Sequence, residues 1–176
     1  MSIVYNGDHS ITFGDGTVRD YKFVGTNTWT DWHLVPAARP MVVTPEVSKK
    51  QLTLPGRDGF IDMSEYLTGG LTYGARSGSW QFFSDHDQVD WISNKQKIID
   101  FLHGKWMKVV LEDEPMWYYE GRFEVADWQN GSDYSSVTIN YTLDSYKRYI
   151  LGAGQWLWDP FCFDTDRTDT ITDKRI

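Results

Sequence analysis

The histidines are the first candidates for chemistry in this 176-residue chain. A metal ion needs ligands that converge from fixed elements, as two His at i and i+4 on one helix do. The four histidines are each isolated in sequence: His9, His33, His86 and His103. His86 lies between Asp85 and Asp87, an arrangement typical of a helix cap. We therefore expect neither a metal site nor a cofactor.

Nucleophilic catalysis would need a Ser or Cys beside a base and an orienting acid. The chain has no G-x-S-x-G elbow, and its single cysteine, Cys162, is flanked by Phe161 and Phe163 as a small buried hydrophobe would be. A lone cysteine also excludes an intrachain disulfide and a thiolate metal cage. Glu112 and Glu120 could act as glycosidase carboxylates across a hairpin, but such pairs are more often solvated strand ends. We expect no catalytic residue and no enzyme activity.

The charge balance argues against electrostatic binding of nucleic acid. With 17 basic and 25 acidic residues, the chain has a formal charge of −8 and an isoelectric point near 4.9. Binding to phosphates needs clustered Lys and Arg, so we expect no specific nucleic-acid binding. Residues 1–8 lack the regions of a signal peptide, and no apolar run is long enough to span a bilayer. We expect synthesis in a cytosol and no membrane insertion.

Aromatic residues are abundant, with nine Trp and ten Tyr. Some of these rings should lie at a surface, where Trp and Tyr favour protein interfaces and sugar platforms. The alternative is an aromatic-rich β core with scattered exposed rings. Trp117 and Tyr119 share one face of an expected strand, which makes them the best sugar platform available; the same face could instead be core or subunit interface.

Turn-formers divide the first half of the chain. Asn6-Gly7 and Asp15-Gly16 predict tight turns between short strands in residues 1–28. Pro36, Pro40, Pro45 and Pro55 each remove a ladder donor, so this stretch should be edge strand and extended arm. A strand should return at residues 79–83. Because long arms bounded by Pro and Gly cannot bury themselves, we expect a neighbouring subunit to cover them.

One helix is predicted from about Asp87 to His103. Ser84, Asp85 and Asp87 could supply N-cap oxygens, and Gly104 is placed for the left-handed C′ position. The apolar side chains fall on one arc: Trp91, Ile92, Ile98, Ile99 and Leu102. Lys95 projects into that arc, where its stem could pack while its amine reaches water, or where it could form an ion pair across a subunit boundary.

A period of two follows the helix and predicts a half-buried antiparallel sheet. Val137, Ile139, Tyr141 and Leu143 alternate with polar residues, as do Met107, Val109 and Leu111 one strand earlier. Three such strands packed on one helix make a mainly β, α+β or β-sandwich domain over residues 1–151. Residues 152–176 form a short aromatic C-terminal extension beyond Gly152-Ala153-Gly154.

Five pieces in a fixed order carry a family resemblance. They are DWHLVPAARP over residues 31–40, PGRDGFIDMSEYLTG over 55–69, YGARSG over 73–78, the helix and the β-meander. Together they resemble the N-terminal region of distal tail (Dit) proteins from phages with long, non-contractile tails, over roughly residues 1–150. Asp144-Ser145-Tyr146-Lys147 resembles a family D-P-Y-K with Ser in place of Pro, which loosens the expected turn.

The resemblance implies a tail-tube-like β-sandwich with one helix and projecting hairpins. It implies a hexameric ring at the tail tip that joins the tail-tube and tape-measure proteins to the tail-associated hub protein. The protein would be a structural part of the virion tail, made in the bacterial host cytoplasm. Longer relatives carry a second, sugar-binding-like domain. The alternatives are a tail-tube protein, which shares the fold, and a small carbohydrate-binding module.

Two sets of residues are candidates for roles in such a ring. Central aromatic and Arg side chains often carry most of the binding energy of an interface. We therefore expect subunit contacts from four residues: Trp29, Trp32, Leu34 and Arg39. An acidic or neutral channel would let DNA pass, and the expected hairpin tip offers three carboxylates for its wall: Glu112, Asp113 and Glu114.

Overall fold

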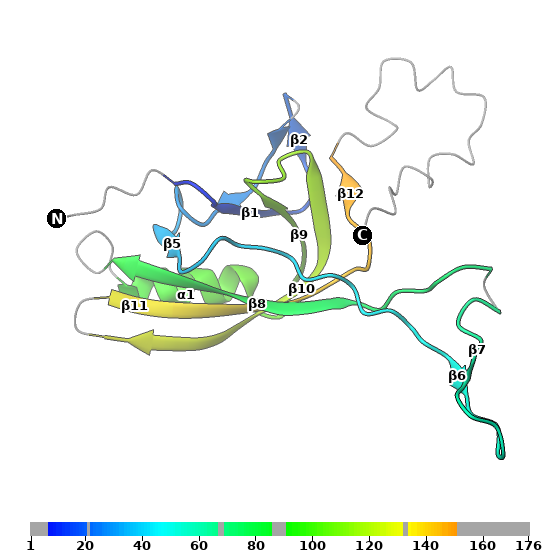
Figure 1. Cartoon of the computed structure of the whole chain (residues 1–176). Coiled ribbons are helices and arrows are strands. Elements are labelled where there is room, and N and C mark those ends of the chain that lie inside the picture. The colour runs from blue at the N-terminus through cyan, green and yellow to red at the C-terminus, as the bar shows by residue number, and fades with distance from the viewer. Residues whose placement is uncertain (1–6, 21, 67–68, 86–90, 132–133, 151–176) are drawn as a thin grey trace, which may run out of the picture.

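The computed structural model describes residues 7–20, 22–66, 69–85, 91–131 and 134–150. Its centre is an eight-stranded sheet in the order β4-β1-β9-β10-β11-β8-β5, with β12 pairing to β10 off this path (Figure 1). Two small hairpins, β2-β3 and β6-β7, lie outside it. The C-terminal extension, Cys162 and His86 lie outside the described residues.

The elements have these bounds: β1 (Ile11–Gly14), β2 (Val18–Arg19), β3 (Lys22–Phe23), β4 (Thr26–Asn27), β5 (Leu34–Pro36), β6 (Gln51–Leu52), β7 (Ile61–Asp62), β8 (Arg76–Asp85), α1 (Trp91–Leu102), β9 (Trp106–Leu111), β10 (Trp117–Asn130), β11 (Tyr134–Leu143) and β12 (Arg148–Tyr149). All paired strands are antiparallel. The mainly β architecture with one helix and projecting hairpins is confirmed.

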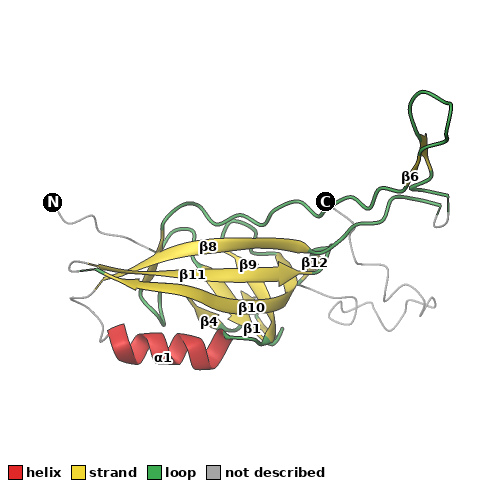
Figure 2. Cartoon of the chain, turned by 90° about the horizontal axis from the view of Figure 1, so that it is seen from below, coloured by secondary structure: helices red, strands yellow, loops and turns green. Residues whose placement is uncertain are grey.

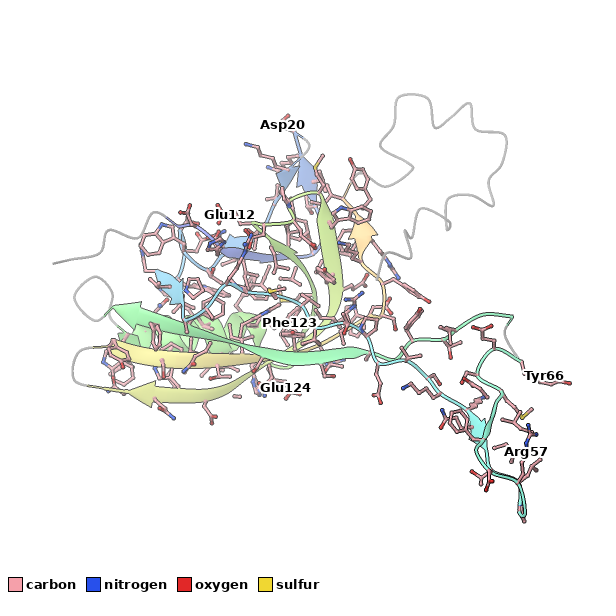
Figure 3. All side chains as sticks on the ribbon, in the orientation of Figure 1. Asp20, Arg57, Tyr66, Glu112, Phe123 and Glu124 are labelled. Atoms are coloured by element: carbon pink, nitrogen blue, oxygen red, sulfur yellow. The ribbon has the colours of Figure 1, made fainter. Side chains whose placement is uncertain are left out.

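Alternation along β11 places its apolar side chains in the core. The four residues predicted to face inward are all buried: Val137, Ile139, Tyr141 and Leu143. The same alternation on β10 turns Phe123 into the body and Glu124 away from it (Figure 3). A bulge between Val125 and Trp128 shifts the register of β10 against β11, which bends this long hairpin.

The sheet folds back on itself around Phe13. Its ring lies 5.1 Å from Phe123 of β10 and 6.4 Å from Trp80 of β8, between ring centroids. Since β1 and β8 are separated by three strands in the sheet order, this contact requires strong curvature. The result is a sandwich-like core made from one bent sheet, with α1 against one side (Figure 2).

Tight turns at two predicted positions shape the ends of elements. Gly16 has φ 104°, and the amide and hydroxyl of Thr17 both donate to Oδ1 of Asp15, at 2.8 and 2.7 Å. After α1, Gly104 has φ 73°, a conformation that favours glycine. Both predictions are confirmed. Gly7 has φ 87°, while Asn6 lies outside the described residues.

The packed face of α1 differs from the predicted one. Its buried residues are Asn94, Ile98 and Leu102, spaced four apart. Ile92 is 62 % exposed, so its predicted place in the core was wrong. With about 100° per residue, Ile92 lies on the side of the helix opposite Asn94. The N-terminal boundary cannot be compared, because residues 86–90 are outside the described residues.

A buried polar residue holds the helix to the chain before β5. Nδ2 of Asn94 donates to the carbonyl of Trp32 at 2.8 Å, in a part of the core from which water is excluded. Lys95 beside it is half-buried, with Nζ 6.0 Å from the ring centroid of Trp128. The stem of Lys95 is therefore packed, as the first of the two alternatives predicted. The ion pair across a subunit boundary stays a prediction.

Replacing Asn94 by Ala should leave the buried Trp32 carbonyl without a donor. We expect the free energy of unfolding to fall by about 2 kcal/mol and the Tm by roughly 4–8 °C. Thermal unfolding followed by circular dichroism measures this. Asn140→Ala, at an exposed position of β11, is the matched control and should change the Tm little. Equal losses in the two variants would contradict the anchoring role of Asn94.

Candidate assembly surface

Residues 44–75 form an arm that projects from the body (Figures 1 and 2). Its two strands are joined near the root by the amide of Gly74, which donates to Glu46 at 2.7 Å, and further out by the β6-β7 pairing. Gly56 and Gly59, at φ 79° and 86°, form the turn at its tip. Residues 67 and 68 of the arm lie outside the described residues. The prediction of an extended arm is confirmed.

Large apolar side chains are concentrated on this arm. Of thirteen exposed large hydrophobic residues in the described part of the chain, six lie on the arm and a seventh lies at its root. These are Val43, Leu52, Leu54, Phe60, Met63, Tyr66 and Leu71. Tyr66 is 78 % exposed and points away from the body (Figure 3). A two-stranded ribbon has no second layer to cover such residues, which makes the arm a candidate interaction surface.

A hollow on the arm adds shape to this surface. It has a volume of about 470 Å³ and is lined by Lys49, Lys50, Gln51, Leu52, Met63 and Tyr66. The lining thus includes three large apolar residues beside two lysines.

The four predicted interface residues are placed differently from one another. Trp32 and Leu34 are 4 % and 0 % exposed and belong to the core of their own chain. Trp29 is half-buried, with its ring 6.0 Å from that of His33. Only Arg39 is largely exposed, at 63 % of its side chain. Side chains that are buried within one copy have no surface left for another, so Trp29 and Arg39 are the two of this set that could reach a neighbour.

The acidic turn between β9 and β10 is tied to other segments by all three carboxylates. Glu112 accepts hydrogen bonds from the amide and hydroxyl of Ser10, at 2.9 and 3.3 Å. Glu114 accepts from the hydroxyl of Tyr119 at 2.9 Å and pairs with Nζ of Lys147 at 3.1 Å. These contacts hold the turn against the N-terminal segment and the chain before β12.

Asp113 lies at the centre of this turn and has two side-chain partners, Arg39 and His9. Its oxygens accept from Nε and Nη2 of Arg39, at 2.9 and 3.0 Å, and from Nδ1 of His9 at 3.0 Å. The Arg39 guanidinium, with a smaller contribution from His9, holds the pKa of Asp113 below its usual value. Much of the turn's negative charge is therefore balanced within the chain.

Trp117 and Tyr119 do not form a sugar platform. Tyr119 is buried, and burial together with the nearby Glu114 raises the pKa of its hydroxyl. Trp117 is half-buried, 5.3 Å from the ring of Tyr149 and below Nζ of Lys147. Of the readings left open for this strand face, core packing is the one that the structure supports.

The other candidate chemical groups lie apart. His9 bonds to Asp113, His33 packs on Trp29, and Nδ1 of His103 accepts from the amide of Val125 at 3.2 Å. Within the described ranges, no group of three or more His, Cys, Asp or Glu side chains is arranged to hold a metal ion. No helix in the described part of the chain has the length and apolar character needed to cross a membrane.

The fold has a counterpart among solved structures. It is similar to the crystal structure of the Dit protein of phage SPP1, presented as a paradigm of the hub adsorption apparatus in phages that infect Gram-positive bacteria. The TM-score is 0.55 at 18 % identity, over 79 % of this chain and 52 % of that one. The chain thus spans about half of that protein's length. No family model and no curated protein matches the chain.

Asp113 should make part of the stability depend on pH. A carboxylate whose pKa is depressed in the folded state stabilises the fold above its unfolded pKa and loses this effect as pH falls through the folded value. In Asp113→Asn, the decline of Tm below about pH 4 should therefore be shallower than in the unaltered protein. Because Arg39 is mostly exposed, the loss at pH 7 should not exceed about 1 kcal/mol.

Thermal unfolding between about pH 2 and pH 7 tests this dependence. Asp127→Asn, at an exposed position of β10, is the control for removal of one negative charge. Identical acid-induced losses in Asp113→Asn and the unaltered protein would show that the cluster of His9, Arg39 and Asp113 contributes nothing to the fold.

Proposed function

We propose that the chain is a structural subunit of a phage tail: a compact distal tail (Dit-like) protein whose copies close into a hexameric ring at the tail tip. The observation that carries this proposal is the arm, on which six large apolar side chains are exposed. The fold shared with the SPP1 protein of a hub adsorption apparatus supports the choice of a phage tail.

The arm and the body are different surfaces, so a contact between them on neighbouring copies is heterologous. Contacts of this kind close into a ring when the rotation between copies divides a full turn, and otherwise they form open filaments. The hollow between Leu52, Met63 and Tyr66 would receive an apolar side chain of the next subunit. Trp29, which precedes β5, and Arg39, which lies between β5 and the arm, could extend the same interface.

In this role the ring would connect the tail tube and the tape-measure protein to the tail-associated hub and the host-recognition apparatus. The subunit would be made in the bacterial host cytoplasm and would work in the virion tail, without enzyme activity or a cofactor. Glu112, Asp113 and Glu114 remain candidates for the channel wall. Since each of them has partners within the chain, repulsion of DNA would come chiefly from the net charge of −8 per copy.

A tail-tube protein is the second candidate, because the resemblance implies the same fold for both. The two differ in how their rings associate, since tube rings stack and a tip ring does not. A carbohydrate-binding module has lost its main support, because Tyr119 of the expected sugar platform is buried.

Native mass spectrometry and negative-stain microscopy of the purified full chain test the proposal. We expect hexamers and single rings. Stacked tubes would favour the tail-tube protein. A strict monomer at high concentration, together with binding on a glycan array, would overturn the structural role.

Charged substitutions on the arm should dissociate the ring without unfolding the subunit. Phe60→Asp and Tyr66→Asp are at positions that are 57 % and 78 % exposed. Each should weaken association by about 2 kcal/mol, roughly 30-fold in Kd, and leave the Tm of the monomer unchanged. Ile92→Asp, at an equally exposed apolar position on α1, is the matched control. Dissociation by Ile92→Asp alone would place the interface on the helix instead.

A further inference from the structure

The root of the arm contains a buried arginine that pairs with none of the described acidic residues. Arg76, the first residue of β8, is 4 % exposed. It forms no ion pair with a described residue, and its Nη2 is buried without a hydrogen-bond partner. Its guanidinium lies 5.6 Å from the centroid of the Tyr119 ring, whose π face offsets part of the charge. A buried cation in this state is costly, so its remaining contacts must stabilise it.

Those contacts are backbone carbonyls on two different segments. Nη1 donates to the carbonyl of Val43 at 3.1 Å, where the chain enters the arm. Nε donates to the carbonyl of Ser145 at 2.9 Å, in the chain that follows β11. Arg76 itself lies where the chain leaves the arm. The planar guanidinium thus joins both ends of the arm to the body, and it can do so only while both segments are in place.

Ser145 completes this junction from the other side. Its hydroxyl lies 2.7 Å from the carbonyl of Gly74 and 3.0 Å from that of Tyr73, the last residues of the returning strand of the arm. The residue is buried, so the contact is shielded from water. Ser145 stands where the D-P-Y-K pattern has a proline, which has no hydroxyl to donate. The departure from the pattern therefore supplies a contact of this chain's own.

We propose that Arg76 and Ser145 form a clamp that sets the direction in which the arm leaves the body. Without it, Val43 keeps only the longer contact of its amide with the Tyr141 hydroxyl, at 3.3 Å, and the nearest anchor of the entering segment is Met41, whose carbonyl accepts from Nε1 of Trp80 at 2.9 Å. The returning segment keeps its covalent link to β8 and the contact of the Tyr73 ring with Tyr146, 6.3 Å between centroids. The consequence for assembly rests on the proposed function: a ring closes only if every arm leaves at the same angle.

The arm's direction can be measured within a single copy. Spin labels at Arg57→Cys near the arm tip (Figure 3) and at Lys97→Cys on α1 report the distance between arm and body. Cys162→Ser removes the native thiol. Excess unlabelled protein dilutes the labelled chains, so that distances between copies do not contribute. The measurement is made in the Phe60→Asp background, in which the ring should dissociate, so that contacts with neighbouring copies do not hold the arm.

Arg76→Met and Ser145→Ala should each widen the distance distribution, by about twofold or more, because one or two buried hydrogen bonds at the root are lost. Hydrogen exchange at the Val43 and Gly74 amides should accelerate roughly tenfold, while the β10 and β11 amides stay protected. Arg76→Lys should restore neither the narrow distance distribution nor the slow amide exchange, since an ammonium lacks the planar fork of donors. Arg19→Met, which removes an exposed arginine on β2 outside the arm, is the matched control and should change neither readout.

Two results would overturn the clamp: unchanged distance distributions in Ser145→Ala and Arg76→Met, or exchange that rises equally throughout the sheet. Ser145→Ala removes a single hydroxyl, so it tests the clamp even if Arg76→Met fails to fold. If the unaltered protein forms no ring while the clamp variants loosen the arm, the proposed function fails and the clamp stands. If rings form normally with a loosened arm, the link between the clamp and ring closure is wrong.

Discussion

The contact of Phe13 with Phe123 and Trp80 determines the layout of the whole molecule. It draws β1 over the sheet toward β8, and the sheet must curl to allow it. The curl leaves one side for α1, and it leaves β8 near an edge, paired outward only with the short β5. The chain on either side of such an edge can extend beyond the body without interrupting the pairing of the other strands. The root of the arm lies at this edge, where the arm returns into β8. The aromatic core and the projecting arm are thus consequences of one packing arrangement.

Local patterns predicted those features that depend on local physics. The period of two placed Val137, Ile139, Tyr141 and Leu143 in the core. Of the prolines that predicted edge strand and extended arm, Pro36 lies in the edge strand β5, and Pro45 and Pro55 lie on the arm. The left-handed Gly104 followed from its position after the helix. In each case the signal lies within a few residues, since side-chain alternation and backbone restriction are properties of the segment itself.

Other features depend on what a segment meets, and the sequence alone could not supply them. Ile92 was predicted to lie in the core because apolar residues lie on two sides of α1. The side that is buried is the one on which Asn94 donates a hydrogen bond to the carbonyl of Trp32. Trp32 and Leu34 were predicted to be interface anchors because their neighbours have the composition of an arm, but both side chains are buried in the core of their own chain. The bond from Arg76 to Ser145 joins residues 69 positions apart, and no local pattern encodes such a pair.

The lead-in to the arm is held mainly by side chains. Among the described residues, the last backbone hydrogen bond to the sheet runs from the amide of Ala37 to the carbonyl of Gln81. Further along, the carbonyl of Met41 accepts from Nε1 of Trp80, and the carbonyl of Val43 accepts from Arg76. A segment fixed in this way can change its path when single side chains change, because no sheet ladder has to be rebuilt. Selection could therefore alter the direction of the arm and leave the aromatic core as it is. In an assembly whose geometry depends on that direction, the few side chains at the root would decide which neighbours fit.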